Sequence, residues 1–183
     1  MIEIKLDEKN VQAAMAFLGN APKEVERAAS AAINRTITKL TKDTSVAVRR
    51  RYVAKAATVK KALDTKRASS GNLMGRLSAT GSTLPLTAFR ISKPQTGPMR
   101  VKVLQGSSPK PVKGLFSRRF PGGYIGPMKR ISRQPYPLKT PAGPSVPQMV
   151  GNENTLRELV PEAERTLNER FIHEVEFRMG RIK

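Results

Sequence analysis

Prolines divide this chain into parts that can and cannot form long helices. Twelve of the 14 prolines lie between Pro85 and Pro147. Proline lacks a backbone N–H and restricts the residue before it, so long helices are excluded from most of this middle part. Long helices are therefore expected towards the two ends of the chain, with loops and extended segments between them.

Hydrophobic periodicity predicts several elements on the N-terminal side. Apolar residues recur every three or four positions over residues 22–52, which predicts one helix about 45 Å long at ~1.5 Å per residue. Before it, apolar and charged residues alternate from Ile2 to Leu6, as in a half-buried strand, and a short helix is expected over Val11–Leu18. Another short helix is expected over Val53–Leu63.

A second helical stripe predicts a C-terminal helical segment over residues 148–180. Proline inside a helix removes a hydrogen bond, so we expect Pro161 to separate a short helix near 148–159 from a longer one over about 160–179. The expected stripe consists of Leu156, Val160, Ala163, Leu167, Phe171 and Val175.

Between the helical ends, the pattern predicts strands and an arm. The expected strands are Lys66–Ser69, Leu73–Ala79, Leu84–Ser92 and Met99–Leu104. Residues 105–140 are irregular and basic, and we expect a hairpin or arm that becomes ordered against a neighbouring subunit through Phe116, Phe120 and Tyr124. The predicted fold is a single α+β domain over residues 1–183, with the two long helices packed on a small, mostly antiparallel sheet.

The net charge of +20 comes entirely from the central part of the chain. Residues 34–139 carry 24 Lys or Arg and two Asp or Glu, whereas each flank has a net charge of −1. Such a block predicts a polyanionic partner, either nucleic acid or an acidic protein surface. The candidate contact residues are Arg49, Arg50, Arg51, Lys60, Lys61, Arg118, Arg119, Lys129, Arg130 and Arg133.

The sequence offers little that could carry catalysis. Without cysteine there is no disulfide and no thiolate metal site. His173 is the only histidine, and a lone histidine in a helix is more often structural than catalytic. Asp43 and Asp64 are the only carboxylates in the basic block, whereas a Mg²⁺-dependent nuclease needs clustered ones. We therefore expect a protein that is not an enzyme and has no cofactor or metal site.

Four motifs in order resemble the phage minor tail protein Z family. Near the N-terminus stand Ala-Ala-Ile-Asn-Arg-Thr at 31–36 and Arg-Arg-Arg-Tyr-Val-Ala-Lys-Ala at 49–56. Leu-Pro-Leu-Thr-Ala-Phe-Arg follows at 84–90, and Gly-Pro-Ser-Val-Pro-Gln-Met-Val-Gly-Asn at 143–152 precedes a charged C-terminal helix. The resemblance covers about residues 22 to 180, and none of these motifs is catalytic.

The resemblance implies a structural virion protein of the neck or tail-completion type in long-tailed phages. It implies a small α+β subunit in a homo-oligomeric ring, which we expect to be hexameric, at the head-proximal end of the tail. The expected neighbours are tail terminator, tail tube or head-completion proteins, and the ring would support head–tail joining and DNA passage. Gly143, Pro144 and Pro147 match the family motif and would form the structural turn before the last helix.

The alternative is a sequence-independent basic protein that binds nucleic acid outside any virion. Contact with the duplex DNA backbone fits the composition better than base stacking, because aromatics are only 5% of the residues. The basic surface could face DNA or an acidic protein.

For the interpretation as a phage tail protein, we expect a virion protein that is assembled in the host cytoplasm and has no membrane partner.

Overall fold

The computed structural model describes residues 1–6, 8–17, 21–92, 98–123 and 125–182 and has an α+β fold, as predicted. The chain divides into two compact units. Unit 1 consists of Met1–Ala47, Leu63–Thr80 and Val150–Lys183, and unit 2 of Val48–Ala62 and Gly81–Met149. Whether the whole chain is one folding domain stays a prediction, because compactness alone does not define a domain.

Unit 1 contains a three-stranded antiparallel sheet. Its strand order is β1-β3-β2, with the strands Ile2–Lys5, Met74–Ala79 and Leu63–Lys66, respectively. Ile2 and Ile4 are buried and alternate with exposed residues, which confirms the predicted half-buried first strand.

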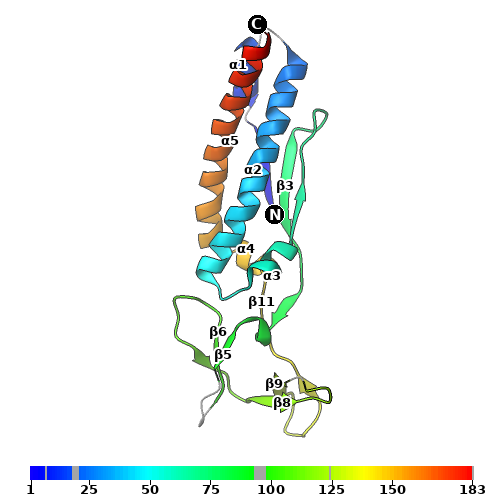
Figure 1. Cartoon of the computed structure of the whole chain (residues 1–183). Helices are drawn as coiled ribbons and strands as arrows, with labels where there is room; N and C mark the ends of the chain where they lie inside the picture. The colour runs from blue at the N-terminus through cyan, green and yellow to red at the C-terminus, as the bar shows by residue number, and fades with distance from the viewer. Residues whose placement is uncertain (7, 18–20, 93–97, 124, 183) are drawn as a thin grey trace. The chain divides into compact units, whose positions relative to one another are not determined.

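Three helices complete unit 1. They are α1 (Glu8–Phe17), α2 (Pro22–Arg51, with its last turn in unit 2) and α5 (Glu153–Ile182). The predicted long helix is confirmed, and α2 lies beside α5 in an antiparallel arrangement (Figure 1). Ala28, Ala29 and Ala32 of α2 are completely buried, and their small side chains permit close approach of neighbouring elements.

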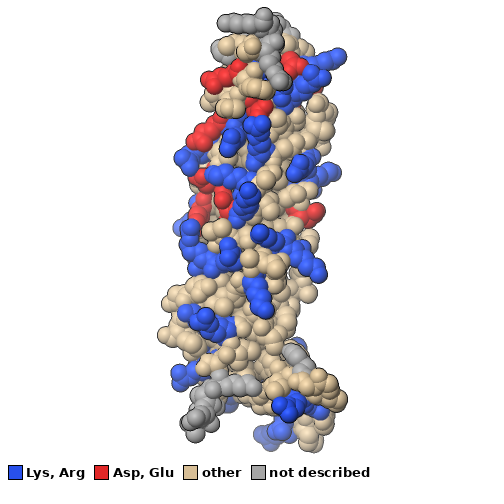
Figure 2. All heavy atoms as spheres, in the orientation of Figure 1, with Lys and Arg blue, Asp and Glu red and all other residues tan. Residues whose placement is uncertain are grey.

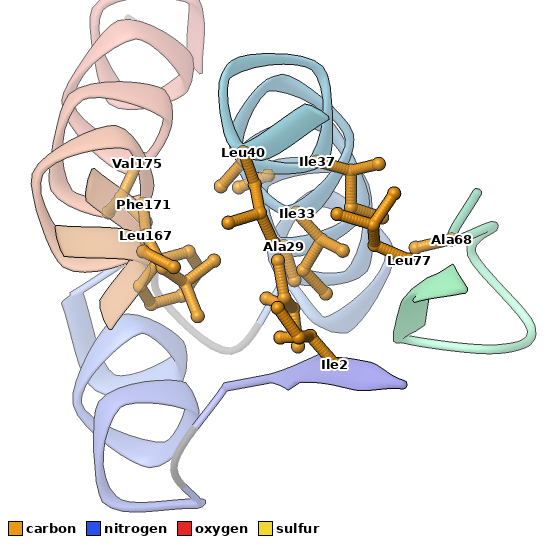
Figure 3. Packing of buried hydrophobic residues seen from close by; sticks show 14 of the residues in the cluster. Ile2, Ala29, Ile33, Ile37, Leu40, Ala68, Leu77, Leu167, Phe171 and Val175 are labelled. Atoms are coloured by element: carbon orange, nitrogen blue, oxygen red, sulfur yellow. The ribbon is translucent and has the colours of Figure 1, made fainter. Parts of the chain in front are cut away.

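The core of unit 1 forms on two sides of α2 (Figure 3). On one side, Leu40 lies towards Leu167, Phe171 and Val175 of α5, and Ala29 lies towards Ile2 of β1. On the other side, α2 directs Ile37 towards Leu77 of β3 and towards Ala68.

Ion pairs border the contact between α2 and α5. Lys39 of α2 pairs with Glu162 of α5 and also donates a hydrogen bond of 2.9 Å to the Thr166 hydroxyl. Towards the other end of the pair of helices, Glu24 of α2 lies 3.4 Å from Arg178. Such partly exposed pairs contribute little stability each, so apolar burial and not the ion pairs holds the two helices together.

The C-terminal helix differs from the prediction in two ways. Pro161 lies inside α5 and does not separate two helices. The break falls earlier, between α4 (Val146–Val150) and α5, where the Asn152 side chain accepts a hydrogen bond from Asn154 N–H at 3.2 Å. Leu159, not Val160, continues the buried stripe, because positions 159, 163, 167, 171 and 175 are spaced by four residues and share one face.

Two strand predictions also need correction. The segment Lys66–Ser69 was predicted as a strand, but the strand is β2, which follows α3 (Ala56–Lys61) and ends at Lys66. Beyond it the chain turns back, and Ser69 and Asn72 exchange two backbone hydrogen bonds of 3.0 Å. The predicted strand Leu84–Ser92 is interrupted by a turn of 3-10 helix, η1, over Leu86–Ala88. The turn follows Pro85 and is closed by a hydrogen bond of 3.0 Å from Phe89 N–H to Leu86 O, and its Leu86 is buried.

Unit 2 is built from short strands around a small apolar core. Its sheets have the orders β11-β4, β5-β6-β7 and β10-β9-β8, and all the pairs are antiparallel. The hairpin expected within residues 105–140 is present as β8–β9. The strands are β4 (Thr83–Pro85), β5 (Arg90–Ser92), β6 (Arg100–Lys102), β7 (Lys110–Pro111), β8 (Leu115–Arg119), β9 (Ile125–Arg130), β10 (Leu138–Lys139) and β11 (Ala142–Ser145).

Two local interactions hold the Gly-Pro-rich turn, residues 143–147, before the last helices. Gly143 lies against the Phe89 ring, where a Cβ atom would come within 2.5 Å of ring carbon Cε2. Ser145 and Gln148 form a capping box: Ser145 N–H donates to Gln148 Oε1 at 2.9 Å, and Gln148 N–H donates to Ser145 Oγ at 3.4 Å. Pro147 falls in the first turn of α4, where its missing N–H has no helical partner to lose.

We predict that Gly75→Ala destabilises unit 1. A Cβ atom at Gly75 would come within 2.5 Å of Ile33 Cγ2 and closer still to Ile37 Cδ1, both in the buried face of α2. Overpacking of this kind costs roughly 1–3 kcal/mol of unfolding free energy. Urea denaturation measures the loss, and Gly71→Ala is the control because nothing lies within 4 Å of its Cβ position. Equal stability of the two variants would contradict the packing described for β3 on α2.

We also predict a pH dependence from Glu162. Hydrogen bonds from Lys39 and then from Arg165 lower the pKa of Glu162 below its ordinary value. Because the folded-state pKa is depressed, the contribution is present above the unfolded pKa, about 4.3, and is lost as the pH falls through the folded-state pKa. Glu162→Gln should therefore reduce the difference in urea midpoint between pH 7 and pH 3.

The matched control is Glu164→Gln, which removes an exposed carboxylate from the same helix without touching Lys39. The same change in pH dependence in both variants would contradict a specific contribution of Glu162 and its two partners, Lys39 and Arg165.

Candidate polyanion interface

The two compact units differ sharply in charge. Unit 2 contains 18 Lys or Arg residues and no Asp or Glu, whereas unit 1 contains 16 Lys or Arg and all 14 acidic residues. In Figure 2 the acidic side chains on the visible face lie over unit 1. Asp43 and Asp64, the two carboxylates within the basic block of the sequence, both belong to unit 1. All ten predicted anion-contact residues belong to unit 2.

The end of α2 carries the first group of predicted residues, Arg49–Arg51. Arg49 and Arg50 are exposed, and Arg51 is partly buried. The backbone here is tied to the segment after β6: Gln105 N–H donates to Arg51 O at 2.9 Å, and Val53 N–H donates to Val103 O at 2.8 Å. These bonds hold the backbone at the helix end, and the charge of its three arginines is favourable at a helix C-terminus.

The end of α3 carries the second group, Lys60 and Lys61. Val59 is completely buried and anchors this short helix, so the two lysines that follow it remain exposed. Ala62 N–H donates to Val59 O at 3.1 Å and closes the last turn. The amines are therefore presented from a fixed backbone at the surface of unit 2.

The β8–β9 hairpin carries the third and largest group. Its register pairs Phe116 with Met128 and Arg118 with Gly126, which places Phe116, Arg118 and Arg130 on one face of the hairpin. By the same alternation, Arg119 and Lys129 belong to the opposite face. The predicted contact residues in this hairpin are therefore split between its two faces.

Arginines and aromatic rings hold each other on the first face. The Arg118 Cζ atom lies 5.4 Å from the centroid of the Phe120 ring and 5.2 Å from that of Tyr136. Arg118 also donates a hydrogen bond of 3.0 Å to the Tyr136 hydroxyl oxygen. Arg130 lies over Phe116 at 5.6 Å. Cation–π contact fixes the guanidinium planes while leaving their edges able to meet an anion.

The structure describes some of the predicted arm residues and adds one that was not predicted. Phe116 and Phe120 are partly buried and contact arginines of the same arm, so a role in subunit contact stays a prediction. Tyr124 lies outside the described residues. Tyr136, which no pattern singled out, lies beyond β9 and meets Arg118 only because the chain folds back through β10. Arg133 is exposed in the bend between β9 and β10.

A metal site or a membrane-spanning helix in the part of the chain that the structure describes would also bear on function. Among residues 1–6, 8–17, 21–92, 98–123 and 125–182, no three His, Asp or Glu side chains form a group that could hold a metal ion. Within the same described part, no helix combines the length and apolar character needed to cross a membrane. His173 is exposed on α5. Comparisons with protein-family models, curated proteins and solved structures found no match to this chain.

We predict that Arg118→Lys loosens the hairpin although the charge is kept. The ammonium group cannot stack as a plane over Phe120 and Tyr136, and cation–π contacts at exposed sites are worth about 0.5–1 kcal/mol. Amide hydrogen exchange across β8 and β9 should accelerate severalfold, as measured by NMR. Arg119→Lys, on the opposite face by register, is the control and should leave exchange nearly unchanged. Equal acceleration of exchange in the Arg118→Lys and Arg119→Lys variants would contradict a specific contribution of the contacts between Arg118 and the two rings.

Proposed function

We propose that this chain is a structural protein of a phage tail, of the neck or tail-completion type. It would form a homo-oligomeric ring at the head-proximal end of the tail, support the joining of head and tail and surround the path of the DNA. Its neighbours would be tail terminator, tail tube or head-completion proteins. The support is the order of the sequence motifs that resemble those of the minor tail protein Z family, together with the charge of unit 2.

The observation that carries the proposal is the absence of any carboxylate from unit 2. A unit with 18 cationic side chains and no anionic one repels itself, and this repulsion is relieved when a polyanion lies against it. Unit 1, with a net charge of +2, has the apolar core and the paired charges of an ordinary folded body. This division fits a subunit that contacts a polyanion through one part and is held folded by another.

The hairpin supports a backbone-directed contact with DNA. Arginines fixed over aromatic rings retain N–H groups at their edges, which suit phosphate oxygens in planar, paired geometry. Here the rings of Phe120 and Tyr136 are already in contact with Arg118 and are less available for stacking on bases. Such a surface would bind duplex DNA without reading its sequence, as passage of a whole genome requires.

The proposal includes no catalytic activity. The positive support is compositional: unit 2 holds neither a carboxylate nor a histidine that could act as a general base or hold a metal ion. A structural role needs none of these groups.

The second candidate is a sequence-independent nucleic-acid-binding protein that acts outside a virion. The same charge of unit 2 favours it, since lysine and arginine displace counterions from any nucleic acid. The two candidates differ in what holds the protein in an assembly. A ring depends on buried apolar contacts between subunits, whereas a plain DNA binder depends on salt-sensitive contacts with phosphate.

Light scattering on the purified full chain, at low and high salt and with or without duplex DNA, tests the proposal. We expect a discrete oligomer that persists at high salt without DNA, because buried apolar contacts are little affected by screening. A monomer that binds DNA only at low salt would favour the second candidate. A monomer that ignores DNA at both salt concentrations would contradict both.

A variant with three arginines of unit 2 replaced then tests whether unit 2 makes the polyanion contact. The triple change Arg118→Gln, Arg119→Gln and Arg130→Gln should weaken duplex binding and lower the slope of log K against log salt by roughly 0.9 for each phosphate that is no longer neutralised. The control changes Lys5, Lys9 and Lys23 of unit 1 to Gln and removes the same charge. Equal effects of the two triple variants would assign DNA binding to net charge rather than to the hairpin.

A further inference from the structure

Unit 1 contains a basic hollow, and none of its lining residues belongs to the candidate interface of unit 2. Its volume is about 530 Å³, and its lining comes entirely from unit 1. Five of the seven lining residues are cationic and none is acidic or apolar. The lining consists of Asn34, Arg35, Thr38, Lys39, Lys42, Arg67 and Arg170.

Three separate parts of the chain bring these cations together. The helix α2 contributes residues 34–42, the segment after β2 contributes Arg67, and α5 contributes Arg170. In the sequence, Arg67 and Arg170 are more than a hundred positions apart. Their convergence in a unit that also holds every acidic residue of the chain is not a consequence of overall charge.

The hollow is positioned by bonds made outside it. Asn34 holds the segment that carries Arg67: its Nδ2 donates to Ala68 O at 2.9 Å, and its Oδ1 accepts from Ala68 N–H at 2.9 Å. Arg35 lies 2.7 Å from a carboxylate oxygen of Glu174, which is buried, and Lys39 pairs with Glu162. Two of the five cations are thus held in place by carboxylates that do not line the hollow.

The remaining three cations have no ion pair in the part of the chain that the structure describes. Lys42, Arg67 and Arg170 are exposed and lack an acidic partner among those residues. The neutral groups of the lining are already used: the Asn34 amide is bonded to Ala68, and the Thr38 hydroxyl donates to Asn34 O at 2.9 Å. The Asn34 and Thr38 side chains thus already have protein partners, and the cations of Lys42, Arg67 and Arg170 are the charged donors that remain in the hollow.

We propose that this hollow binds phosphate groups. Guanidinium groups match phosphate oxygens in paired geometry, and a cluster of unpaired cations favours a multiply charged anion. The volume is within the range of small-ligand sites, about 300–1,000 Å³. A hollow of this size can hold a small anion but not the surface of a folded acidic protein. With no apolar or aromatic side chain in the lining, recognition is of the phosphates and not of a base.

The phosphates have two chemical sources, a free oligophosphate or the backbone of a nucleic acid. The inference does not rest on the proposed function, because the hollow belongs to unit 1 and the candidate interface to unit 2.

Calorimetric titration of the full chain with inorganic tripolyphosphate at fixed ionic strength tests the proposal. The test variant is Arg67→Gln with Arg170→Gln, which removes two exposed guanidinium groups without breaking an ion pair of the described residues. The control is Lys5→Gln with Lys23→Gln, two exposed lysines of unit 1 that do not line the hollow. We expect the test variant to lose about tenfold or more in affinity and the control to lose less than about twofold.

Thermal unfolding without ligand establishes that both double variants are folded. Arg67→Lys with Arg170→Lys keeps the charge but not the paired N–H geometry, and should retain an intermediate affinity. Absence of tripolyphosphate binding by the unchanged protein at millimolar concentration would overturn the proposal. So would an equal loss in the test and control variants, or selective binding of a poly-glutamate peptide in place of tripolyphosphate.

A second titration with a short DNA duplex identifies the source. If the test variant loses duplex affinity and the control does not, the hollow takes phosphates of nucleic acid; if only tripolyphosphate binding falls, it takes a free oligophosphate. Changing the hairpin arginines 118, 119 and 130 to glutamine should leave tripolyphosphate affinity within about twofold. Failure of phosphate binding in the hollow is thereby distinguished from failure of the proposed function.

Discussion

The burial of α2 on two sides is the constraint on which the rest of unit 1 depends. Its alanines 28, 29 and 32 are completely buried, and Ile33 and Ile37 leave space for only a hydrogen atom at Gly75. A helix buried this closely cannot rotate or slide without overlap, because protein interiors are close-packed. The positions of α5, β3 and the segment at Ala68 are therefore fixed against one helix, and the ion pairs along α5 follow from that register.

The two units balance their charges differently. In unit 1, carboxylates face cations across α2 and α5, so its charges largely compensate one another. Unit 2 has no carboxylate and must fold against its own repulsion, with a small apolar core and with guanidinium groups placed over aromatic rings. A ligand that binds only the folded form stabilises it, so a polyanion against unit 2 would strengthen its fold as well as the assembly.

Local patterns predicted the elements well where one face of an element is buried. The stripe in α2 and the alternation in β1 were both read correctly, because burial on one side imposes a period of 3.6 or 2. Prediction failed where packing overrode local preference, as at Pro161, which α5 accommodates while its buried face continues through Ala163. The capping box of Ser145 and Gln148 was visible in the sequence, and its spacing could have located the start of α4.

The sequence by itself determined the α+β composition, the helical ends, the basic middle and the lack of thiol chemistry, because each depends on residue type or local spacing. Only the tertiary structure placed both acidic residues of the basic block in unit 1 and left unit 2 entirely cationic. It alone brought Tyr136 onto Arg118, and Arg67 and Arg170 to one hollow. The residues in each of these contacts are separated along the chain. Their proximity depends on how helices and strands pack, and a local sequence pattern does not encode that packing.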